Sequence, residues 1–118
     1  MIFNTAKYIR YLHENNWLMK EFDLKKRTKS FTISILNLVD NLPMKNSTRI
    51  IANQLGKSGS SVGANYRASL RARSDNEYLS KMNIVLEETD ESHFWLEVLQ
   101  ELNVVDNATL SSIMDGID

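Results

Sequence analysis

The chain has 118 residues, which suffices for one domain but not for two separate hydrophobic cores. Its composition, 42% hydrophobic and 25% charged, is that of a globular protein, and the lack of cysteine excludes disulfides and thiolate zinc sites. No apolar run is long enough to span a bilayer, and the first residues lack the pattern of a secretion signal. We therefore expect a cytoplasmic protein with no membrane partner.

The charges are divided unevenly along the chain, although the net charge is only −1. Residues 1–73 hold 13 Lys and Arg against 4 Asp and Glu, whereas residues 74–118 hold 1 Lys against 11 Asp and Glu. One interpretation is that the two halves pack together and their charges pair across helices. The other is that a basic face remains free to bind a polyanion.

The first elements are an uncertain N-terminal segment and a helix. Residues 1–18 contain apolar residues at helical spacing and form either an extra amphipathic helix or an upstream extension, so the domain proper is expected at 19–118. Phe31, Ile35 and Leu38 predict a helix over 25–41 with one buried stripe. Pro43 ends this helix, because the residue before a proline avoids the helical conformation.

The next helix is expected over 48–72, with Asn46 or Ser47 as its N-cap. The apolar and small residues keep their spacing of three and four through GKSGSSVGAN, which a flexible linker or a phosphate-binding loop would not do. Gly59 and Gly63 lie one turn apart and predict a flat face on which another helix packs closely. Gly63→Leu should therefore be severely disruptive.

Two more helices complete the chain. Ser74 and Glu77 form the S-x-x-E pattern of a capping box and predict a long helix over 75–102. Asp106 or Asn107 begins a last short helix over 108–115, before Gly116. The chain shows no strand-like alternation, so we predict an all-α fold, an antiparallel up-and-down four-helix bundle.

Three segments carry a family resemblance: KKRTKSFTISILNLVDNLP, IIANQLGKSGSSVGANYRASLRARS and SKMNIVLEETDESHFWLEVLQEL. Over residues 19–102 they resemble the bacterial four-helix bundle proteins, also called the 23S rRNA intervening-sequence protein family. The matching positions are Arg27, Thr28, Phe31, Gln54, Ser58, Gly59, Ser61, Gly63, Asn65, Arg67, Arg71, Ser74, Lys81, Glu88, Glu91 and Trp95.

The resemblance implies a left-handed four-helix bundle that often assembles into a homopentameric ring. Some members are encoded inside rRNA genes, and a relative, the accessory variability determinant of diversity-generating retroelements, works with a reverse transcriptase and RNA. Two positions depart from the pattern. Ala68 replaces a usual glutamate, which weakens a shared acid–base site, and Gly56 replaces a usual leucine, which is expected to lengthen the close-packing face.

No catalytic group, metal site or cofactor is predicted. The acids at 87–91 could act in acid–base chemistry or bind a metal, but only Asp90 and His93 have the three-residue spacing of a di-iron half-motif. We therefore expect a protein that is not an enzyme and has no small-molecule substrate. Instead, we expect a structural polar network in which arginines pair with acids across helices, formed by Asn65, Arg67, Arg71, Glu88 and Glu91.

Two functions remain open. The first is an oligomeric scaffold that binds RNA or DNA through Lys25, Lys26, Arg27, Lys29 and Arg73. The second is a structural or protein-binding ring whose charges are paired internally. Both include a homo-oligomer, with a pentamer favoured, because the aromatics Phe22, Tyr66 and Phe94 are too many to bury in so small a bundle. Trp95, Phe94 and Tyr78 are assigned to the core or to subunit contacts.

Overall fold

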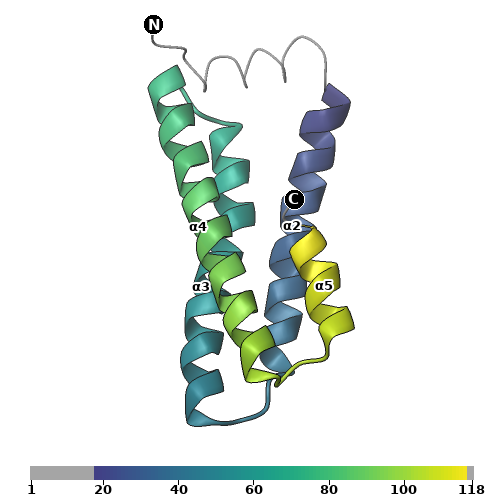
Figure 1. Ribbon diagram of the computed structural model, residues 1–118. Coiled ribbons are helices and arrows are strands. Elements are labelled where there is room, and N and C mark those ends of the chain that lie inside the picture. Colours follow the sequence, from purple (N-terminus) through teal and green to yellow (C-terminus); the bar gives the residue numbers. More distant parts are fainter. Residues whose placement is uncertain (1–17, 117–118) are drawn as a thin grey trace, which may run out of the picture.

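The structure is a computed structural model that describes residues 18–116. Within that range the chain forms four helices: α2 (Leu18–Asp40), α3 (Asn46–Ser69), α4 (Asp75–Leu102) and α5 (Asn107–Asp115). Successive helices run in opposite directions, and α5 covers only the lower part of the gap between α2 and α4 (Figure 1). The all-α, up-and-down bundle predicted from the sequence is confirmed, with a short fourth helix.

The predicted extension at residues 1–18 lies outside the described residues except for Leu18, the first residue of α2. That helix therefore begins seven residues before the predicted start at Lys25 and ends at Asp40, close to the predicted Asn41. In residues 18–116 we find no helix that combines the length and apolar character needed to cross a bilayer.

α3 is one continuous helix from Asn46 to Ser69 and shows no break at its glycines, as predicted. It ends three residues earlier than the predicted Ala72. A Cβ atom placed on Gly59 would lie 2.5 Å from Ile35 Cγ2, and one on Gly63 would lie 2.8 Å from Thr32 Oγ1. The two glycines therefore allow the close approach of α2 that the sequence predicted.

The hydroxyl group of Thr32 forms two hydrogen bonds across this contact between α2 and α3. Thr32 Oγ1 donates to the Gly59 carbonyl oxygen at 2.7 Å and accepts from the Gly63 backbone N–H at 3.3 Å. The expectation that Gly56 extends the close-packing face is wrong. A Cβ atom at that position would have no neighbour within 4 Å, so Gly56 is not part of the close contact between helices.

The hydrophobic core has two parts, which lie at different heights of the bundle. The lower part joins all four helices and consists of Ile35, Leu38, Leu42, Ile51, Leu55, Leu96, Leu99 and Leu110. The upper part is smaller because α5 does not reach it, and it consists of Val62, Tyr66 and Val85. Between α3 and α4, the buried Ser92 hydroxyl donates to Ser58 Oγ at 2.8 Å, which fixes the register of these two helices.

The helix ends agree with the predicted caps in two cases of three. Ser74 Oγ accepts from the Glu77 backbone N–H at 3.0 Å, and Asp106 Oδ1 accepts from the Thr109 N–H at 2.8 Å. The α3 cap is different: the N-cap is Lys45, not Asn46 or Ser47. The reason is the buried Thr48, whose hydroxyl accepts from the Lys45 N–H, so that the helix begins at Asn46, two residues earlier than expected.

Candidate nucleic-acid interface

A groove between α2 and α3 gathers three cationic side chains. Lys25 and Lys29 contribute from α2, one turn apart, and Arg67 contributes from α3. The groove has a volume of about 200 Å³, and the remaining lining residues are Thr32, Ser60, Gly63 and Ala64. No carboxylate is among them. The bottom of the groove is formed by small side chains, because the contact at Gly59 and Gly63 brings α2 and α3 close together.

The five predicted nucleic-acid residues do not form one surface. Lys25 and Lys29 face the groove, whereas Lys26 and Arg27 line a different depression beside α5, together with Asp23. Arg27 Nη2 also lies 3.5 Å from the Gly116 carbonyl oxygen. The separation follows from the helix itself, since consecutive residues point about 100° apart.

Arg73 is also separate from the groove. It lies in the turn after α3 with its side chain 91% exposed, and its Nε atom is 3.8 Å from Glu77 Oε2. An ion pair this open to solvent contributes little to stability and leaves the guanidinium accessible.

The predicted pairing of Arg67 and Arg71 with Glu88 and Glu91 is wrong. The ion pairs shown among residues 23–116 are Arg73–Glu77 and His93–Glu97, each within one helical turn. The hydrogen bond between Ser58 and Ser92 shows which residues of α3 and α4 lie side by side. Counted from that pair at 1.5 Å per residue, Arg67 is displaced along the bundle axis by roughly 7 Å from Glu88 and by more from Glu91. Both arginines are exposed.

The other members of the predicted polar network have local partners. The Asn65 side-chain amide donates to Ser61 Oγ at 2.7 Å and to the Ser61 carbonyl oxygen at 2.9 Å, both within α3. Partial burial raises the pKa of Glu88, and the negative charges of Glu91 and Glu87 raise it further, while Lys57 acts in the opposite direction. The cation that acts on Glu88 is therefore Lys57, not Arg67.

The arrangement of the helices separates the lysines of α2 from the acids of α4. Within residues 18–116 the backbones of α2 and α4 do not come close to each other, because each packs against α3 and α5 and the two meet only through side chains of the core. α3 contains no acidic residue, whereas α4 contains eight acids and a single lysine. Among the described residues, the charge interaction shown between helices is thus that of Lys57 with Glu88, and neither of the two ion pairs joins one helix to another.

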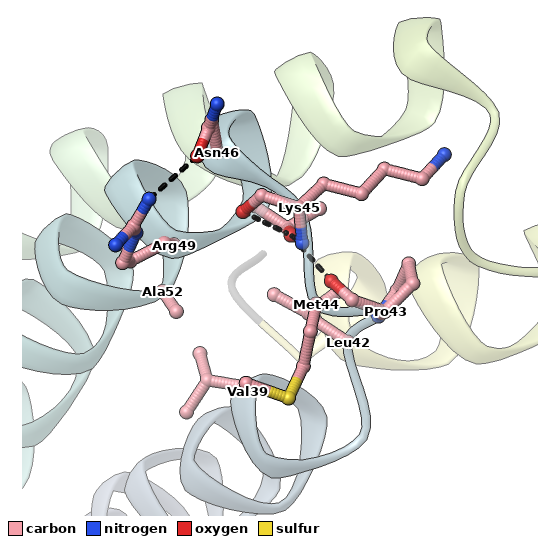
Figure 2. A pocket seen from close by; sticks show the side chains of 9 residues that line it. Val39, Leu42, Pro43, Met44, Lys45, Asn46, Arg49 and Ala52 are labelled. Atoms are coloured by element: carbon pink, nitrogen blue, oxygen red, sulfur yellow. Dashed lines mark hydrogen bonds between the residues drawn. The ribbon is translucent and has the colours of Figure 1, made fainter.

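A second groove lies at the corner where α2 turns into α3 (Figure 2). It has a volume of about 410 Å³ and is largely apolar, with Val39, Met44 and Ala52 among its lining residues. Arg49 lines its edge and donates to Asn46 Oδ1 at 2.6 Å. The Lys45 side chain points away from the groove (Figure 2). This corner offers an apolar depression and one further cation, with no group arranged for catalysis.

The aromatic residues are divided between core and surface. Tyr66 and Tyr78 are both 2% exposed, so the expectation that Tyr66 is a surface aromatic is wrong, while the assignment of Tyr78 to the core is confirmed. Phe94 is 54% exposed and packs edge-on against the partly buried Trp95, with ring centroids 4.9 Å apart. Phe22 lies outside the described side chains. None of these rings lines the basic groove.

The fold and the groove define an all-α bundle protein with a basic groove between α2 and α3. The chain belongs to the 23S rRNA-intervening sequence protein family, whose model matches residues 20–118. This confirms the resemblance seen in the sequence and extends it to the last helix.

A solved structure supports the fold. The chain is similar to a protein of unknown function from the S23 ribosomal protein family of Bacteroides thetaiotaomicron, with 30% sequence identity and a TM-score of 0.74. The match covers 80% of this chain and 87% of the other. No curated protein matches this sequence.

Proposed function

We propose that this chain is a non-enzymatic protein of the cytoplasm that binds RNA or DNA through the α2/α3 groove. The observation that carries the proposal is the convergence of Lys25, Lys29 and Arg67 on one groove, with no carboxylate among its described lining residues. All three side chains are exposed, and none has an ion-pair partner among residues 23–116. Uncompensated cations on a rigid surface are the usual means of holding a phosphate backbone.

The shape of the groove suits this ligand. Phosphates must come close to the helices for lysine and arginine to reach them, and Gly63 and Ala64 leave room for that approach. Arg49 lies on the same side of α3, about 27 Å farther along the helix axis, where it adds a second cationic position. Because no aromatic ring is among the described residues that line the groove, we expect binding with little sequence preference. The family description names rRNA, so structured RNA is the first ligand to try.

The proposal is tested by fluorescence anisotropy with a structured RNA and a duplex DNA at low and physiological salt. The variant carries Lys25→Glu, Lys29→Glu and Arg67→Glu. The matched control is Lys57→Glu, which makes the same kind of charge change on an exposed position of α3 outside the groove. The parent and the control should bind at low salt, and the triple variant should bind at least tenfold more weakly. A parent that does not bind at low salt, or a triple variant that binds as the control does, refutes the proposal.

We also propose that the chain forms a homo-oligomer, with a pentamer favoured. If the protein does not bind nucleic acid, this oligomer would act as a structural or protein-binding ring. It is supported by large apolar side chains left on the surface, among them Leu86 at 64% and Phe94 at 54% exposure. In such a ring further charges would pair between copies, since no ion pair joins two helices among residues 23–116 of one chain. Analytical ultracentrifugation should give a multiple of the 13.6 kDa chain mass, and a monomer at all concentrations contradicts this.

A further inference from the structure

The outer face of α4 carries exposed apolar residues among acids. Leu79, Leu86 and Phe94 are 37%, 64% and 54% exposed and follow one another at intervals of seven and eight residues, so they share one side of the helix. Asp90 lies midway between Leu86 and Phe94, and Glu97 continues the line by one turn; both are exposed. We call these five residues the acidic stripe.

The outer face of α2 carries exposed apolar residues among lysines, with an exposed acid, Asp40, at the C-terminal end of the helix. Ile33 and Leu36 are 49% and 42% exposed and lie one turn apart. Lys29 and Lys26 precede Ile33 by four and seven residues, which places both on its side of the helix, and both are exposed. These four residues form the basic stripe. Its apolar part is separate from the lining of the α2/α3 groove, with which it shares only Lys29.

The two stripes match each other but cannot meet inside one chain. Both stripes consist of exposed side chains, and within residues 18–116 the backbones of α2 and α4 do not come close to each other, because each helix packs on α3 and α5. We propose that the acidic stripe of one copy docks against the basic stripe of a second copy. This inference rests on the proposed homo-oligomer and names the two surfaces that build it.

Charge decides how the copies are oriented. Two acidic stripes facing each other would bring Asp90 and Glu97 of both copies together, and the repulsion would oppose that symmetric dimer. The acidic stripe on the basic stripe instead combines apolar contact with opposite charges. Each copy then uses two different surfaces, so the contact is head-to-tail and repeats from copy to copy until a ring closes.

Two exposed variants test the pairing, each designed to repel only one partner surface. Leu86→Lys places a cation in the acidic stripe, where it would face lysines of the next copy. Ile33→Asp places an acid in the basic stripe, where it would face Asp90 and Glu97. Both positions are open to solvent, so the fold should be retained, which circular dichroism verifies. Ile50→Asp, at a 59% exposed position of α3 outside both stripes, is the control.

Light scattering at the highest soluble concentration gives the masses. The parent and Ile50→Asp should assemble, and each stripe variant alone should be a monomer. A mixture of the two stripe variants should form a heterodimer, because the intact basic stripe of one fits the intact acidic stripe of the other.

A monomeric parent, a stripe variant that keeps the parental mass, or a mixture that stays monomeric overturns the inference. Nucleic-acid binding by the α2/α3 groove is measured separately on the same proteins. A variant that no longer assembles therefore does not refute nucleic-acid binding, and a protein that does not bind nucleic acid does not refute the proposed interface.

Discussion

Replacing Gly59 with alanine should destabilise the protein, although alanine is the better helix former. In an open helix the exchange stabilises by about 1 kcal/mol, because glycine loses more backbone freedom on folding. At Gly59 the new Cβ would lie 2.5 Å from Ile35 Cγ2 and 2.9 Å from both Ile35 Cβ and Cγ1. Ile35 is fully buried and branched at Cβ, so it cannot rotate away and the helices must separate.

The expected size of the effect is the difference between two terms. Forced overpacking of a tight core costs about 1–3 kcal/mol, so the net loss at Gly59 should be up to about 2 kcal/mol once the helix-propensity gain of about 1 kcal/mol is subtracted. Gly56→Ala is the matched control on the same helix, since a Cβ there has no neighbour within 4 Å. It should stabilise by about 0.5–1 kcal/mol.

Urea unfolding followed by circular dichroism measures both variants. The reasoning predicts opposite signs at two positions only three residues apart. If Gly59→Ala is as stable as Gly56→Ala, the close contact between α2 and α3 is not what places glycine at position 59.

Three further substitutions should have measurable effects on stability. Gly63→Leu should prevent the native packing of α2 on α3, because even its Cβ would lie 3.1 Å from the Thr28 carbonyl oxygen; a urea midpoint equal to that of the parent would contradict this. Ser74→Ala removes the side chain that caps α4 and should cost about 1 kcal/mol in the same assay, whereas an unchanged midpoint would show that the cap contributes nothing. Glu88 has a raised pKa in the folded state, which therefore binds its proton more tightly than the unfolded chain does and loses stability as pH rises through that pKa. Glu88→Gln should accordingly melt above the parent at pH 7, with a difference that shrinks as the pH falls through the raised pKa and is lost below pH 4.5, and a difference independent of pH would argue against burial as the cause.

Local signals in the sequence predicted the helices well. The limits of α4 agree at both ends, because Ser74 and the residues after it form a cap whose geometry depends on a few neighbouring atoms. The unbroken α3 could be predicted because apolar spacing persists through Gly59 and Gly63. The N-cap of α3 could not, since it depends on how the buried Thr48 hydroxyl turns back on the preceding residues.

The candidate site was predicted only in part, because it depends on how the helices are rotated and aligned. Lys25 and Lys26 are neighbours in sequence but line different depressions. Arg67 was assigned to an ion pair with Glu88, but in the structure it faces the α2/α3 groove and forms no ion pair with Glu88. A signal for Arg67 does exist: it lies four residues after Gly63, so the helix face that packs on α2 continues toward it.

The salt dependence of nucleic-acid binding tests the central claim most directly. Each phosphate contact by lysine or arginine contributes about 0.9 to the slope of log K against log salt concentration on duplex DNA. Replacing Lys25, Lys29 and Arg67 with glutamine removes three groove cations without adding repulsion, so the slope should become shallower by about 2 to 3 units. Lys57→Gln should leave it unchanged. A triple variant with the slope and affinity of the parent would show that the α2/α3 groove does not hold the phosphate backbone.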